Sequence, residues 1–137
     1  MSPRPRVIDP PELARPRGFA HGIVAPAGAR LLSVAGQVGW DGAARLVGES
    51  FGAQWERALD NVLAVVRAAG GSPRDVVRMT VYVTDRREYA AALSELGAVW
   101  RERFGKHYPA MALVEVAALL EPGAKIEIEA TAALAPE

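Results

Sequence analysis

The chain has 137 residues, half of them apolar and 23% charged, which is enough for one domain with its own hydrophobic core. Sixteen basic residues balance sixteen acidic ones, so no net charge attracts the chain to nucleic acid or to an anionic membrane. The absence of cysteine excludes disulfides, thiolate nucleophiles and cysteine metal sites, and it fits a cytoplasmic protein. No apolar run approaches the ~20 residues of a membrane-spanning helix.

Residues 1–17 are rich in proline and arginine, while Asp9 and Glu12 dilute the positive charge. Proline favours extended backbone in itself and in the residue before it, so these residues predict an extended segment laid over the surface. The alternative, a basic arm, has less support because of the two acidic residues. We expect residues 18–137 to form the single folded domain.

Four stretches before residue 85 are expected to form β-strands, and residues 76–84 alternate apolar and polar residues as is typical of a strand. Gly36 and Gly39 interrupt one such run and indicate a bulge or a close backbone approach. In a later run, Val77 is expected on the same face as Met79. Strands are therefore expected at residues 6–8, 19–24, 30–40 and 76–84.

Two amphipathic helices are expected. In residues 50–69, Trp55 and its apolar neighbours recur at helical spacing, and Gln54 is expected on the polar outer face. A second helix is expected to start at a cap formed by Asp85 and to run to about Phe104.

Residues 108–132 alternate again on both sides of a Pro122-Gly123 pair, which predicts two strands joined by a turn as a hairpin. Two helices on one face of a mixed sheet make an α+β fold. The second face of the sheet is expected to be semi-polar, so another subunit is expected to cover it. Residues assigned to that face are Thr80, Tyr82, Leu113 and Ala117.

Five segments carry the motifs of a known family: VAGQV (34–38), ALDNV (58–62), VVRMTVYVTD (76–85), PAMALVEV (109–116) and KIEIEA (125–130). On these motifs the chain resembles the RidA/YjgF family of enamine and imine deaminases. The resemblance implies a chorismate-mutase-like fold and a homotrimer with a small-molecule cleft at each subunit interface. We expect no cofactor, metal, nucleic acid or membrane partner, because no phosphate loop, dinucleotide fingerprint or metal-ligand spacing is found.

The family's chemistry needs an arginine for the substrate carboxylate and a glutamate for the attacking water. The resemblance assigns the glutamate to Glu127, the expected catalytic residue, whereas Met111 stands in place of the arginine. A family aromatic, a hydroxyl residue and an asparagine fall on or near Phe19, Ala35 and Ser94. The residues expected to bind a ligand are thus Phe19, Ala35, Gly36, Gln37, Ser94 and Met111.

The methionine changes the expected ligand. A buried carboxylate without its cation costs at least several kcal/mol, whereas burial of a whole methionine side chain recovers roughly 1.5–3 kcal/mol. We therefore expect weak or absent activity on 2-imino acids and a larger, less acidic ligand. Arg17 or Arg30 could instead supply the missing cation from another part of the chain. Structural roles are the alternatives for three candidates: Met111 as a core residue, Glu127 as a solvated strand residue, and Gln37 as a side chain that binds the backbone at the bulge.

Two functions from different classes follow from this set of residues. The first is a divergent hydrolase or deaminase that acts on an enamine, an imine or a related C–N bond of a metabolite. The second is a non-catalytic trimer that binds a small metabolite or regulates a partner. In its extreme form the trimer has a structural role alone and its clefts are vestigial. Turnover by Glu127 would distinguish the two functions.

Overall fold

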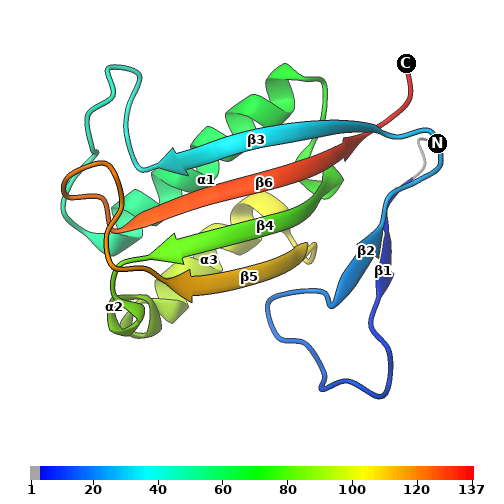
Figure 1. Cartoon of the computed structure of the whole chain (residues 1–137), viewed down its shortest axis with the longest axis horizontal. Helices are drawn as coiled ribbons and strands as arrows, with labels where there is room; N and C mark the ends of the chain where they lie inside the picture. Colours follow the sequence, from blue (N-terminus) through cyan, green and yellow to red (C-terminus); the bar gives the residue numbers. More distant parts are fainter. Residues whose placement is uncertain (1–3) are drawn as a thin grey trace.

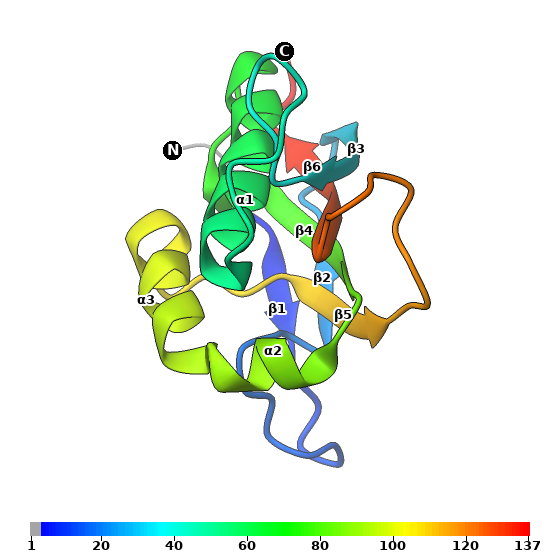
Figure 2. The ribbon, with the colours of Figure 1, turned by 90° about the vertical axis from the view of Figure 1, so that its left-hand side faces the viewer.

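Four strands form one sheet in the order β3-β6-β4-β5 in the computed structural model, which describes residues 4–137 (Figure 1). The first three residues of the expected segment 1–17 lie outside the described residues. Helices cover one face of the sheet and leave the other face open (Figure 2). The mixed α+β architecture with helices on one face is confirmed. The elements of this layer pair are β3 (Arg30–Val38), α1 (Phe51–Ala68), β4 (Val76–Val83), α2 (Arg86–Ala91), α3 (Leu93–Phe104), β5 (Ala110–Glu115) and β6 (Ile126–Leu134).

The expected hairpin of β5 and β6 is wrong. β4 lies between the two strands and pairs in parallel with β5 and antiparallel with β6, so that Thr80 is in register with both Ala112 and Glu129. Residues 116–125 cross the end of β4 instead of forming a tight turn (Figure 1). The alternation of residue types predicted both strands correctly, but alternation does not specify which strand becomes the neighbour.

Two register shifts change which side chains face the helices. One lies between Val34 and Gln37, which confirms the bulge expected around Gly36. The other lies between Val76 and Arg78, so Val76 is fully buried in place of the expected Val77.

The face assigned to Leu113 is also wrong. Leu113 is in register with the fully buried Val81 and packs against the core, so it does not belong to the open face. Parallel neighbours in register point to the same side of a sheet, which places Met111 and Leu113 together on the helical side.

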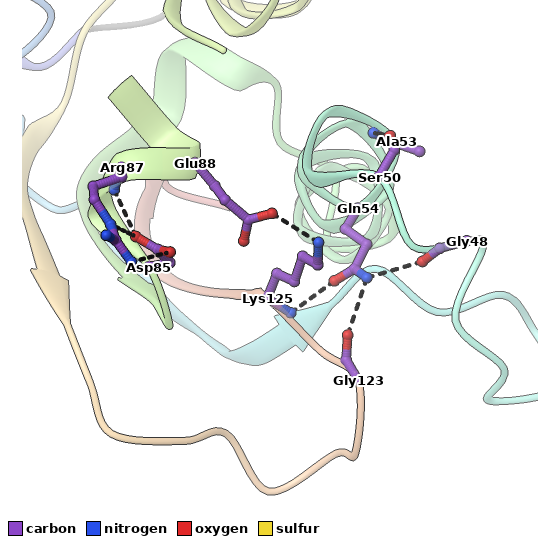
Figure 3. Close-up of polar contacts among 9 residues, drawn as sticks. All are labelled: Gly48, Ser50, Ala53, Gln54, Asp85, Arg87, Glu88, Gly123 and Lys125. Atoms are coloured by element: carbon purple, nitrogen blue, oxygen red, sulfur yellow. Dashed lines mark hydrogen bonds and ion pairs between the residues drawn. The ribbon is translucent and has the colours of Figure 1, made fainter. Parts of the chain in front are cut away.

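Helix α1 follows its predicted boundaries closely. Ser50 caps the helix by accepting a hydrogen bond from the Ala53 N–H at 3.0 Å, and Gly70 with φ +87° follows its end. The outward position expected for Gln54 is wrong, because its side chain is fully buried. Backbone groups satisfy its amide: Nε2 donates to Gly48 O (2.9 Å) and Gly123 O (3.2 Å), and Oε1 accepts from Lys125 N (2.8 Å) (Figure 3).

The second expected helix is divided in two at Ala92. Its N–H still donates to Glu88 O and Tyr89 O, which ends α2, and α3 starts at the next residue. Alanine is the best helix former, so composition alone contains no signal for this break.

The N-terminal strands β1 (Arg6–Ile8) and β2 (Gly22–Val24) pair with each other, apart from the main sheet (Figure 1). An isolated parallel bridge joins Ala20, just before β2, to Ala110 at the start of β5. In this bridge the Ala20 N–H donates to Pro109 O at 3.0 Å. This bridge places residues 17–20 beside the start of β5. Within residues 4–137, no helix combines the length and the apolar character that a membrane crossing requires.

Candidate functional site

The open face of the sheet carries a row of polar side chains from its two central strands. Because Ile126 and Ile128 of β6 are fully buried under the helices, the alternating residues Glu127 and Glu129 project to the opposite face. The Tyr82 hydroxyl donates to Glu129 Oε1 at 2.6 Å. This hydrogen bond to a carboxylate raises the pKa of Tyr82, with desolvation and the negative charge as further causes.

Glu127 differs from its neighbour Glu129 in having no hydrogen-bond or ion-pair partner in the described part of the chain. Among residues 4–137, no side chain or backbone donor forms a hydrogen bond or ion pair with its carboxylate. The side chain lies against the bulge of β3: a Cβ built on Gly36 would meet Glu127 Oε2 at 2.7 Å. Glycine at this position therefore leaves the space that the carboxylate occupies, and its acceptor oxygens remain available to water or a ligand.

Ala35 and Gly36 lie within the register shift between Val34 and Gln37, and Gly36 is the bulge residue against Glu127. The Gln37 side chain donates from Nε2 to Ala35 O at 3.2 Å. This contact supports the structural alternative for Gln37, a tie that holds the bulge. The bulge residues and the carboxylate together make one candidate half-site on the open face.

Met111 lies on the other face of the sheet. It is in register with the fully buried Met79 and packs against the core. It also lines a cavity of ≈ 220 Å³ between β5 and the helices, here called the Met111 cavity. One chain therefore does not bring Met111 and Glu127 together. Side chains that line the cavity include Arg17, Trp55, Tyr89, Trp100, Tyr108 and Met111.

Phe19 and Ser94 lie near the Met111 cavity without lining it. Phe19 lines an adjacent hollow that shares Tyr108 with the cavity, and its ring meets His21 edge-on at 5.2 Å between centroids. Ser94 is exposed on α3, and the residue before it, Leu93, lines the cavity.

Arg17 is one of the two residues that the sequence left open as a replacement cation. It lines the Met111 cavity together with the methionine. Arg30, the other cation left open by the sequence, is engaged elsewhere: its Nε donates to Ala135 O at 3.0 Å, and its guanidinium pairs with Glu137. The expectation of a less acidic ligand stays a prediction.

Trp55 and Trp100 are functional candidates that sequence reasoning missed. Both recur at helical spacing among apolar residues, a pattern typical of a hydrophobic core, and both are indeed nearly buried. Only the placement of β5 at the edge of the sheet shows that they also wall a cavity.

Known proteins match this chain over most of its length. The family model described as Endoribonuclease L-PSP matches residues 15–134. The chain is 37% identical over 105 residues to the 2-iminobutanoate/2-iminopropanoate deaminase of Salmonella typhimurium, covering 74% of this chain and 78% of that protein. It is 32% identical over 108 residues to the human protein of the same name, covering 78% and 75%.

Solved structures show the same similarity across nearly the whole chain. A Rid-family protein of unknown function from Yersinia pestis superposes with a TM-score of 0.84 at 36% identity, covering 96% of this chain and 99% of that one. The YjgF gene product of E. coli superposes with a TM-score of 0.68 at 32% identity, covering 93% and 98%.

Proposed function

Because the chain belongs to the YjgF/RidA (Endoribonuclease L-PSP) family, we propose that it hydrolyses the C=N bond of an imine, or of the imine tautomer of an enamine. The observation that supports the proposal is the Glu127 carboxylate, which is held against Gly36 on the open face and is without a partner among the described residues. The proposed substrate is larger and more apolar than the 2-imino acids named in the two deaminases, because Met111 replaces the arginine of the family motif.

In this proposal Glu127 accepts a hydrogen bond from a water molecule and orients it towards the imine carbon. The water oxygen forms a bond to carbon, and the C=N π electrons move to nitrogen, which takes up a proton. The resulting carbinolamine expels ammonia and leaves a carbonyl, so that imine and water give ketone and ammonia. Glu127 serves as the proton carrier between the water and the nitrogen.

A complete site in this proposal requires a second copy of the chain. Glu127 and Met111 project from opposite faces of the same sheet, so the pair can line one cleft only if they come from different subunits. The homotrimer expected from the resemblance supplies such an arrangement at each interface. The homotrimer and the cytoplasmic location stay predictions.

Ammonia release tests the proposed hydrolysis. Imines are generated in place by an amino-acid oxidase from alanine and from phenylalanine, and ammonia is measured with and without the protein. The wild-type chain is expected to accelerate hydrolysis, with preference for the aromatic imine, and Glu127→Gln is expected to lose at least about 100-fold in rate. Equal rates for the wild-type and Glu127→Gln proteins would exclude Glu127 from the reaction.

A non-catalytic binding protein is the second candidate function, and Met111 favours it. Loss of the arginine removes the strongest grip on a small substrate but leaves a cavity that can hold a ligand. Saturable ligand binding without ammonia release from any imine would support this function and exclude the first.

A further inference from the structure

One stripe of helix α1 is polar although it faces other parts of the chain. Gln54, Arg57 and Asn61 are spaced three and four residues apart, so they lie on one face of the helix. All three side chains donate hydrogen bonds to backbone carbonyls of segments outside the helix. The stripe therefore holds neighbouring backbone segments in place.

Asn61 of this stripe holds the end of β3. Its Nδ2 donates to Val38 O at 3.1 Å and to Trp40 O at 2.9 Å, and Arg57 Nε donates to Trp40 O at 3.2 Å. The Trp40 N–H also donates to Val38 O, at 2.9 Å. The two lone pairs of the Val38 carbonyl are thus occupied by groups outside β6, and β3 ends at this residue.

This end of β3 is the part that pairs with Glu127. Beyond the register shift, two residues of β3 are in register with β6, and the last pair is Val38 with Glu127. A slip of one residue turns every side chain of a strand to the opposite face of the sheet. Because the paired stretch is so short, its register depends on what holds it at each end. The bulge at Gly36 holds one end and Asn61 holds the other.

We propose that Asn61 is a positioning residue of the hydrolysis, which by holding Val38 keeps the Glu127 carboxylate against Gly36 in the orientation that the attacking water needs. The fit at Gly36 is close, since an added Cβ would meet Glu127 Cγ at 3.1 Å, so a slip of β3 would displace the carboxylate. Asn61 belongs to the helical layer and Glu127 projects to the open face, so Asn61 acts through the backbone of β3 and not by contact with the substrate. This inference rests on the proposed function and deepens it.

Asn61→Ala and Asp60→Ala form a matched pair of variants that tests the proposal in the full chain. Asp60→Ala removes the ion pair with Arg103 of α3, so it weakens the attachment of the same helix to a different element. Asn61→Ala is expected to lower kcat for imine hydrolysis about tenfold or more and to change KM about twofold or less, because a displaced carboxylate misorients the water. Asp60→Ala is expected to keep both constants within about twofold of the wild-type values.

A nuclear Overhauser effect between the Hα protons of Gly36 and the Hγ protons of Glu127 measures the same contact without turnover. The wild-type chain and Asp60→Ala are expected to show this effect, and Asn61→Ala is expected to lose it. A thermal melt of each variant checks that the fold is retained at the temperature of the measurement. If Asn61→Ala does not fold, Asn61→Asp takes its place with the same expected losses, because it keeps the shape of the side chain but lacks the amide donor.

Three results would overturn the proposal: an unchanged kcat in Asn61→Ala, an Overhauser effect that survives in it, or equal losses in Asn61→Ala and Asp60→Ala. The third result would show that any loosening of α1 disturbs the site. Failure of the proposed function gives a different pattern, in which the wild-type chain releases no ammonia or Glu127→Gln retains full turnover. The Overhauser effect would then decide by itself whether Asn61 holds Glu127 against Gly36.

Discussion

The side-chain amide of Gln54 on α1 accepts a hydrogen bond at 2.8 Å from the backbone N–H of Lys125, two residues before Glu127 (Figure 3). The same buried amide donates to backbone carbonyls on both sides, at Gly48 and Gly123. Lys125 is held a second time, because its Nζ pairs with Glu88 Oε1 of α2 at 2.8 Å. A buried polar residue of the helical layer thus fixes where β6 begins, and with it the strand that carries the candidate catalytic carboxylate.

Gln54→Leu is expected to destabilise the protein substantially. The substitution keeps the volume but leaves two carbonyls and one N–H without their side-chain partner, each in a partly buried place. Unpaired buried groups cost about 1–3 kcal/mol each, and relaxation or water recovers part of this, so we expect a loss of about 2–4 kcal/mol. Urea unfolding monitored by circular dichroism measures the change in the free energy of unfolding.

The other glutamine provides a matched control for this substitution. Gln37→Leu removes a single exposed hydrogen bond to Ala35 O, and its expected cost is about 1 kcal/mol or less. Equal losses for the two variants would show that the Gln54 network contributes nothing specific.

Gly36→Ala is expected to impair catalysis more than stability. The new Cβ would approach Glu127 Oε2 to 2.7 Å, so the carboxylate must move, and a flexible side chain moves at little cost. We expect a loss of about tenfold or more in the rate of ammonia release, because a displaced carboxylate no longer positions the water. The free energy of unfolding should change by about 1 kcal/mol or less.

Gly39→Ala gives the opposite pattern and serves as the comparison. Its Cβ would meet the Cα of Gln54 at 2.7 Å and the backbone oxygen at 2.8 Å, and backbone atoms in a packed helix cannot give way cheaply. We expect a loss of about 1–3 kcal/mol in stability.

If Gly36→Ala leaves ammonia release unchanged, the assignment of Glu127 is contradicted.

The sequence predicted the positions of the helices and strands better than it predicted which strands pair with each other. Alternation along 126–134 correctly placed Glu127 opposite the buried isoleucines, since side-chain period alone decides the face. The same alternation could not show that β4 lies between β5 and β6, because strand order depends on long-range packing. Gln54 was assigned to the surface from its polarity, and only the backbone groups gathered around it explain its burial.

The candidate site was likewise predictable only in part. The motifs of the family located Glu127 and Gly36, and the structure places them in contact. The Met111 cavity was not predictable, because its walls come from three helices, from β5 and from the segment around Arg17, which lie far apart in the sequence. The choice of Arg17 over Arg30 likewise depended on the contacts of Arg30 with the C-terminal residues.

Tyr82 is expected to titrate above its ordinary pKa of 10.0, because its hydroxyl donates to the Glu129 carboxylate and ionisation would place two negative charges together. A raised pKa means that the fold favours the neutral phenol. The resulting stabilisation is fully present below the unfolded pKa and is lost as the pH rises through the folded one. Glu129→Gln should lower the pKa of Tyr82 towards the ordinary value.

Ultraviolet absorbance of tyrosinate as a function of pH measures this titration. Subtraction of the curve of Tyr82→Phe isolates Tyr82 from Tyr89, whose pKa is also raised, in that case by burial. For the Glu129→Gln protein, the curve of the double variant with Tyr82→Phe and Glu129→Gln is subtracted in the same way. A Tyr82 titration that does not move in Glu129→Gln would mean that the two groups do not interact in solution.

Met111→Arg is expected to increase the hydrolysis of small 2-imino acids and to decrease that of aromatic ones. The new guanidinium would restore the family's cation in the Met111 cavity, where it can bind a carboxylate bidentately, and would occupy the volume that an aromatic ring needs. We expect a gain of about tenfold or more in kcat/KM for 2-iminopropanoate and a loss of similar size for the aromatic imine. Met111→Leu, which nearly conserves the volume, should change neither rate. A wild-type chain that already hydrolyses 2-iminopropanoate rapidly, with no gain from the arginine, would show that the methionine does not decide the substrate.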